Sequence, residues 1–83
     1  MNKISLDARE MEHPKPLEEA IKILKELGDE DYLYMLHRKR PVPLIDLAQK
    51  HHFDVLDRED DVGQWHILIT KNRSADLIEY LSV

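Results

Sequence analysis

The stretch Pro16-Leu17-Glu18-Glu19-Ala20-Ile21-Lys22-Ile23-Leu24-Lys25-Glu26-Leu27-Gly28 decides the fold of this 83-residue chain. Its apolar residues recur at helical spacing while its charged residues fall off that stripe, which predicts an amphipathic helix that begins near Pro16 and ends at Gly28. Residues 4–8 before it alternate apolar and polar, and residues 32–36 after it are aromatic and apolar, so both segments are predicted strands. Because strand–helix–strand crossovers are right-handed, these two strands are expected to be parallel neighbours.

The rest of the chain predicts a second helix and a hairpin. An apolar stripe over residues 44–48 indicates a shorter helix, and residues 53–56 and 65–70 are predicted strands joined by an acidic loop, residues 57–61, and a turn at Gly63. Ser74-Ala75-Asp76 is suited to cap a final helical turn. The order β-α-β-α-β-β predicts a two-layer α/β sandwich, with two helices on one face of a four-stranded mixed sheet. We expect one domain over residues 1–83, with a core of about 3–71 and a C-terminal extension, 72–83.

Composition excludes several classes of function. Seventeen acidic residues against twelve basic ones give a net charge of −5, which argues against a nucleic-acid partner. The absence of cysteine rules out disulfides, thiolate metal sites and sulfur carriage on a thiol. No signal-peptide pattern and no membrane-spanning apolar run is present, so we expect a cytoplasmic protein without a membrane partner.

Both helices begin with the same short motif. The first helix start is His13-Pro14-Lys15-Pro16-Leu17 and the second is Arg40-Pro41-Val42-Pro43-Leu44. Neither motif has a side chain suited to cap the helix, so the free N–H groups there must be met by water, by the protein elsewhere or by a ligand. Because parallel strands end at the same edge of a sheet, the two helix starts should meet there, and ligands of open α/β sheets bind at that edge. The candidate ligand-binding residues are therefore His13, Lys15, His37 and Arg40.

The first helix start carries a resemblance to a known group of proteins. Asp7-Ala8-Arg9 followed by His13-Pro14-Lys15-Pro16 resembles the SirA/TusA-like superfamily, whose signature is Asp-x-Arg before Cys-Pro-x-Pro. In this resemblance His13 stands at the place of the sulfur-carrying cysteine, so a persulfide relay is chemically impossible. The second helix start after His37, with the aromatic strand at residues 64–70, is similar to a related bacterial and archaeal family of unknown function. The resemblance spans about residues 6–71 and implies a small cytosolic accessory domain, of a kind that accompanies hemerythrin-like domains in some relatives.

The leading hypothesis for function is a non-catalytic accessory protein that binds a metal, a haem or a partner protein. His13 and His37, brought to one sheet edge, could coordinate Zn²⁺, Cu²⁺ or a haem iron. Two imidazoles do not close a metal site, so a third ligand is needed from Met11, Glu12 or His66, or from a second subunit.

Two alternatives remain open. One is an enzyme in which His13 is the general acid–base and Arg40 clamps an anion. The other is a protein–protein interaction module, such as a homodimer, that uses the last strands or residues 74–83. The basic run Arg38-Lys39-Arg40 is either a solvated strand exit or a site for an anion or an acidic partner.

The remaining polar and aromatic residues are assigned structural roles. Asp7 and Arg9 are expected to pair at the exit of the first strand, and His51 and His52 to be exposed at a helix end. Three aromatic residues are expected to pack on the sheet: Tyr32, Tyr34 and Trp65.

Overall fold

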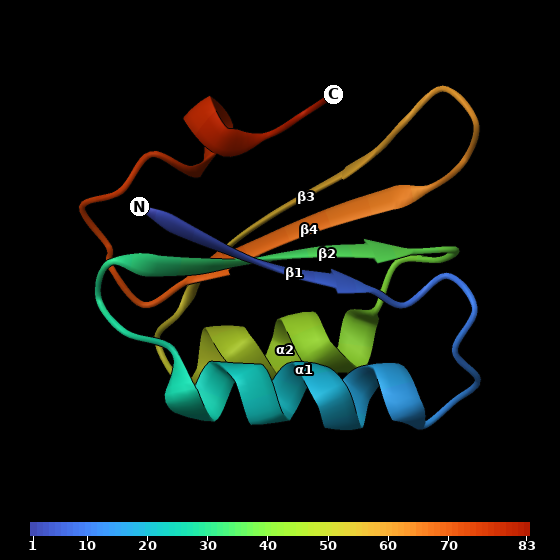
Figure 1. The fold of residues 1–83 in the computed structure, drawn as a ribbon, viewed down its shortest axis with the longest axis horizontal. Helices are drawn as coiled ribbons and strands as arrows, with labels where there is room; N and C mark the ends of the chain where they lie inside the picture. Colours follow the sequence, from blue (N-terminus) through green and yellow to red (C-terminus); the bar gives the residue numbers. More distant parts are fainter.

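The computed structural model describes residues 1–83 and has the predicted order of elements (Figure 1). They are β1 (Asn2–Asp7), α1 (Lys15–Glu26), β2 (Asp31–His37), α2 (Val42–Lys50), β3 (Asp54–Glu59), β4 (Trp65–Thr70) and a short 3-10 turn, η1 (Leu77–Tyr80). Neither helix is long and apolar enough to cross a membrane.

The four strands form one mixed sheet in the order β1-β2-β4-β3. β1 and β2 pair in parallel, with Leu6 opposite Met35, whereas β4 is antiparallel to both β2 and β3. Both helices lie on one face of this sheet (Figure 1). The expected two-layer α/β sandwich is confirmed. Because β1 and β2 run in parallel and each is followed by a helix, the starts of α1 and α2 lie at the edge where both strands end.

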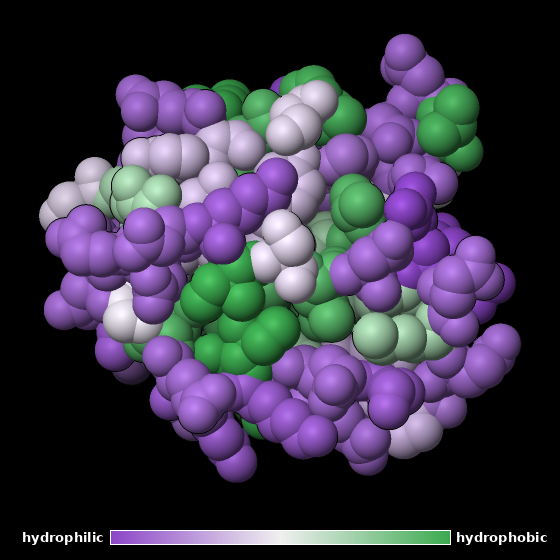
Figure 2. All heavy atoms as spheres, viewed as in Figure 1, coloured by the Kyte–Doolittle hydropathy of each residue, from purple (hydrophilic) through white to green (hydrophobic).

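Apolar side chains are buried on both faces of the sheet. Alternation along β2 sends Leu33 and Met35 toward the helices and Tyr32 and Tyr34 to the opposite face, so each face has its own cluster. The helix-side cluster consists of Ala8, Ala20, Leu24, Leu27, Leu33, Met35, Leu44, Ala48, Ile67 and Ile69. In the space-filling view, apolar atoms also reach the surface along the seam between β1 and α1 (Figure 2).

The C-terminal segment covers part of the helix-free face. Leu77 of η1 is buried there, and the ring of Tyr80 lies 4.8 Å from that of Tyr32, measured between centroids. The predicted cap is confirmed, because the Asp76 side chain accepts a hydrogen bond from the Ile78 N–H. Residues 72–83 therefore contribute to the second cluster.

One segment differs from its prediction. Residues 57–61 were expected to form a solvated loop, but β3 continues to Glu59, and only Asp60 and Asp61 belong to the turn. β3 lies at the edge of the sheet, where one side of the strand and part of its surface are open to water. An edge strand of this kind accepts charged residues that a central strand would exclude.

Candidate functional site

The starts of the two helices border one open cavity of about 430 Å³. Its lining comes from four parts of the chain: the segment after β1, the first turn of α1, the end of β2 with the segment that follows, and the first turn of α2. The lining residues are Met11, Glu12, His13, Pro16, Leu17, Met35, His37, Arg38, Lys39, Arg40, Pro41, Pro43 and Leu44.

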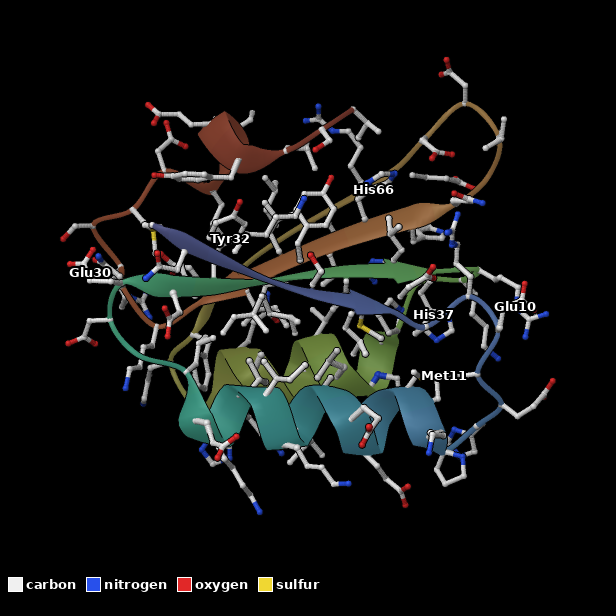
Figure 3. All side chains as sticks on the ribbon, in the orientation of Figure 1. Glu10, Met11, Glu30, Tyr32, His37 and His66 are labelled. Carbon is white, nitrogen blue, oxygen red and sulfur yellow. The ribbon has the colours of Figure 1, made fainter.

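Three of the four predicted ligand-binding residues line this cavity. His13, His37 and Arg40 come together there although they are distant in sequence, whereas Lys15 is exposed and is not part of the lining. Of the three residues expected as a third metal ligand, two line the cavity and one does not. Met11 and Glu12 line the cavity, but His66 lies across the sheet, on the face opposite His37 (Figure 3).

His37 is the buried polar side chain of the cavity. It ends β2 with only 7% of its surface exposed, and it lies on the helix side of the sheet near Met11 (Figure 3). Its Nδ1 accepts a hydrogen bond from the Lys39 backbone N–H at 3.2 Å. Because a backbone N–H only donates, the neutral ring carries its proton on Nε2.

That Nε2–H has no partner within the protein. Every fully buried side-chain nitrogen or oxygen of the protein has a hydrogen-bond partner, so the unpartnered Nε2 must be reached from the cavity. Burial lowers the pKa of His37, and the neighbouring charges of Lys39 and Arg38 lower it further, which keeps the ring neutral at pH 7. His37 thus offers the cavity one neutral N–H donor.

The start of α1 offers a second donor. The amides of Lys15 and Glu18 donate to backbone carbonyls of the preceding turn, and Pro16 has no amide hydrogen. No side chain caps this helix. The N–H of Leu17, a lining residue, is therefore the free amide of the first turn.

The start of α2 repeats this arrangement. The amides of Val42 and Ile45 donate to backbone carbonyls, Pro43 has no amide hydrogen, and no side chain caps the helix. The remaining free amide belongs to Leu44, which also lines the cavity. The repeated Pro-x-Pro-Leu motif therefore leaves one free N–H at the third position of each helix.

The rim of the cavity is rich in positive charge although the chain as a whole is acidic. Arg40 Nε donates to Asp57 Oδ2 at 2.6 Å, and Arg38 lies 4.0 Å from Glu12, the one acidic residue of the lining. Lys39 takes part in no ion pair. The rim therefore carries one cation that nothing in the protein neutralises.

Histidine, aspartate and glutamate side chains of one chain do not complete a metal site around His13 and His37. No group of three or more histidine, aspartate or glutamate side chains lies close enough to hold a metal ion. A histidine that binds a metal usually donates its other ring N–H to a carboxylate or a carbonyl, whereas Nδ1 of His37 accepts a hydrogen bond. In this tautomer Nε2 is a donor, so a metal at Nε2 would require the ring proton to move to Nδ1 and the bond from the Lys39 N–H to break.

The structure also contains a polar network that the sequence did not predict. His66 Nε2 lies 2.9 Å from Asp60 Oδ2, and its Nδ1 lies 2.8 Å from the Tyr34 hydroxyl. The Ser82 N–H donates to the same hydroxyl at 3.0 Å. The strand alternation of residues 32–36 and 65–70 was a usable signal for which side chains share a face, but it did not reveal these partners.

The predicted pair at the exit of β1 is confirmed, and it lies outside the cavity. Arg9 holds both carboxylate oxygens of Asp7, at 2.7 and 2.8 Å, which lowers the pKa of Asp7 to about 2. A further bond from Arg9 to Gln64 Oε1 at 3.3 Å ties this exit to the hairpin. His51 and His52 are exposed as expected.

Comparison with known proteins agrees with this architecture. The family model described as "Uncharacterized conserved protein (DUF2249)" matches residues 5–71. The crystal structure of a SirA-like protein from Desulfitobacterium hafniense matches with a TM-score of 0.69 at 25% sequence identity, over 78% of this chain and 92% of that chain. No curated protein matches the chain. The chain therefore belongs to the DUF2249 family and has a SirA-like α/β fold.

Proposed function

We propose that this chain is a non-catalytic binding domain that holds a small ligand in the cavity between the starts of α1 and α2. The observation that carries this proposal is the unpartnered Nε2–H of His37, whose ring is otherwise buried. This nitrogen opens on the cavity, where water meets it in the free protein, and a ligand that accepts its hydrogen bond would take the place of that water. The cavity volume of about 430 Å³ also falls within the usual range for small-molecule sites.

Binding accounts for the cavity better than catalysis does. A general acid–base must be held in place by its neighbours, but His13 is exposed and makes no hydrogen bond through its side chain. Arg40, the anion clamp of the enzyme hypothesis, is bonded to Asp57. A persulfide relay is excluded because the chain has no cysteine.

Among the ligands expected from the sequence, the tautomer of His37 favours one that accepts a hydrogen bond over a metal or haem iron that would need a lone pair. A partner protein would meet the same donors by inserting an acceptor into the cavity. The replacement of a cysteine by His13, the cytoplasmic location and the homodimer all remain predictions.

NMR titration of the isotope-labelled protein tests the proposal. The probes are benzoate, benzyl alcohol, benzylamine, Zn²⁺ and haemin, and the signals followed are the histidine rings and the amides of Leu17 and Leu44. We expect at least one probe to shift the His37 and leucine signals saturably. His51 and His52, which are exposed, report surface binding of metals.

The substitution His37→Asn should abolish or weaken that response, because the shorter side chain lacks the Nε2 donor but keeps an acceptor near the position of Nδ1. His51→Asn is the matched control and should bind as the wild type does. If no probe shifts the cavity signals, or if only His51 and His52 respond, the proposed function is wrong.

A further inference from the structure

We infer that the ligand of this cavity is a small organic monoanion, a carboxylate with an apolar body. The inference rests on the proposed function and adds the chemical class of the ligand to it. It follows from three features of the lining, namely its hydrogen-bond donors, its single free charge and its apolar walls.

The uncompensated polar groups of the cavity are donors. They are the Nε2–H of His37 and the free amides of Leu17 and Leu44. A carboxylate accepts several hydrogen bonds through its two oxygens, so one carboxylate can serve all three donors. An amine, by contrast, would add donors to a site whose one acidic lining residue, Glu12, already lies 4.0 Å from Arg38.

The two amides also stand at the positive ends of helix dipoles. α1 has twelve residues and α2 has nine, and both begin at the cavity. Helix N-termini favour negative charge, and no side chain caps either helix; Glu18 already places a carboxylate in the first turn of α1, whereas the first turn of α2 has no acidic residue. His37 is the independent observation, because it lies on a strand, is more than nine-tenths buried and directs an unpartnered N–H to the same space.

The charge of the rim indicates one negative charge on the ligand. Arg40 is neutralised by Asp57 and Arg38 is near Glu12, so Lys39 is the cation left without a partner. His37 adds no charge at pH 7, since its pKa is lowered. A monocarboxylate matches one free cation better than a dianionic phosphate does.

The walls of the cavity supply the apolar contacts. Met11, Leu17, Met35 and Leu44 line it together with the prolines at the starts of both helices. A volume of about 430 Å³ can receive an aromatic ring or a short acyl chain attached to the carboxylate. The donors would then orient the head group while the apolar body contacts the walls.

The test compares three probes that share an aromatic body and differ in charge with inorganic phosphate, an anion that lacks this body. The wild-type protein is titrated at pH 7 and constant ionic strength with sodium benzoate, benzyl alcohol, benzylamine hydrochloride and sodium phosphate. We expect benzoate to shift the amides of Leu17 and Leu44 and the His37 ring saturably. Its affinity should exceed that of each other probe by about tenfold or more, since its hydrogen bonds are charge-assisted.

Variants assign the effect to the named groups. His37→Asn should lower the benzoate affinity by about tenfold and Lys39→Gln by about threefold, corresponding to one charge-assisted hydrogen bond and one exposed charge. His51→Asn and Lys25→Gln, which change the same residue types far from the lining, should leave the affinity unchanged. Lys39 is exposed, so its variant keeps the test valid if His37→Asn folds poorly.

The outcomes separate this inference from the proposed function. If benzyl alcohol or benzylamine binds in the cavity as tightly as benzoate, the assignment of a monocarboxylate ligand is wrong but the binding function stands. The same holds if phosphate binds more tightly, or if Zn²⁺ or haemin is coordinated by His37 Nε2. If none of the organic, anionic or metal probes shifts a cavity signal, both the inference and the proposed function are wrong.

Discussion

Two buried histidines on adjacent strands have opposite surroundings. His37 ends β2 and is 7% exposed, while His66 lies near the start of β4 and is 8% exposed. They lie on opposite faces of the sheet (Figure 3). Both ring nitrogens of His66 have protein partners, whereas one nitrogen of His37 has none. The two residues are therefore equally buried, and they differ in that both nitrogens of His66 have protein partners while one nitrogen of His37 opens on the cavity.

The surroundings of His66 explain its structural role. Asp60 accepts from the N–H groups of Val62 and Gln64 at the hairpin turn, and its second oxygen meets His66. The bond to His66, followed by the bond from Gln64, lowers the pKa of Asp60. On the other side of the ring, Tyr34 connects His66 to the C-terminal segment. The network thus joins the turn, the central sheet and the C-terminus.

The largest effect that would separate the two histidines is expected for His66→Ala. The substitution leaves a space on a packed face and removes the partner of the Tyr34 hydroxyl, so the free energy of unfolding should fall by about 2–3 kcal/mol. His37→Asn should cost less than about 1 kcal/mol, since it retains an acceptor for the Lys39 N–H. Urea unfolding of both variants measures the difference. Equal losses of stability would contradict the assignment of different roles.

A smaller effect is expected for Tyr34→Phe, which removes only the hydroxyl between His66 and the C-terminus. The free energy of unfolding should fall by about 1 kcal/mol, the usual contribution of one such hydrogen-bonded group. The Ser82 amide loses its acceptor, so its hydrogen exchange should accelerate more than that of Leu68, which faces Tyr34 in the sheet. Unchanged exchange at Ser82 would show that the hydroxyl does not hold the C-terminal segment.

Protonation of His37 should make a small contribution to the pH dependence of the free energy of unfolding. Its folded-state pKa is lowered from the usual 6.5, so below pH 6.5 the unfolded chain binds more protons than the folded protein does. The contribution of His37 to stability is therefore full above pH 6.5 and is lost as the pH falls through the folded-state pKa. Glu12 and His13 also line the cavity beside Arg38 and Lys39, so the wild type must be compared with His37→Asn.

Urea unfolding at pH 7.5, 6.5 and 5.5 measures this comparison. The variant should lose less stability than the wild type between the highest and the lowest pH, because the groups other than His37 titrate in both proteins. Identical profiles would mean that His37 is not held neutral by its surroundings. His51→Asn, which alters an exposed histidine, should reproduce the wild-type profile.

The contrast also shows what sequence can predict in this fold. The missing capping residues indicated free amides at the starts of both helices. The parallel course of the first two strands placed those helix starts at one sheet edge, which was enough to bring His13, His37 and Arg40 together. The partners of His66 were not predictable in the same way. Asp60 is near in sequence but was assigned to a solvated loop, and Tyr34 is 32 residues away. Strand alternation predicts the face of a side chain, but its partner depends on register and on the turn.

The protonation state of His37 was equally beyond prediction from residue types. It depends on one bond from a backbone amide two residues later, which exists because the chain turns at Lys39 after leaving β2. The sequence therefore suggested a metal ligand, and the geometry indicates a hydrogen-bond donor. An imidazole can be a metal ligand or a hydrogen-bond donor, and the partner of its other ring nitrogen determines which role a given nitrogen can take.

The smallest predicted effect concerns the charge of the cavity rim. Asp57→Asn removes the carboxylate that Arg40 Nε contacts at 2.6 Å. This pair is partly exposed, so its loss should lower the free energy of unfolding by only about 0.5 kcal/mol. It should also leave Arg40 without an ion-pair partner at the rim. The added positive charge should raise the benzoate affinity about twofold. The variant would thus be less stable and would bind more tightly.

Asp54→Asn is the matched control for this experiment. It lies on the same strand and removes a similar ion pair, that with Arg73 at 3.7 Å, but neither residue lines the cavity. Its stability should change as little as that of Asp57→Asn while the benzoate affinity stays unchanged. If both variants bind benzoate equally well, general charge attraction determines the affinity and the pairing of Arg40 does not. If only Asp57→Asn gains affinity, the affinity depends on charge at the rim itself, as expected for a site in which Lys39 is the one free cation.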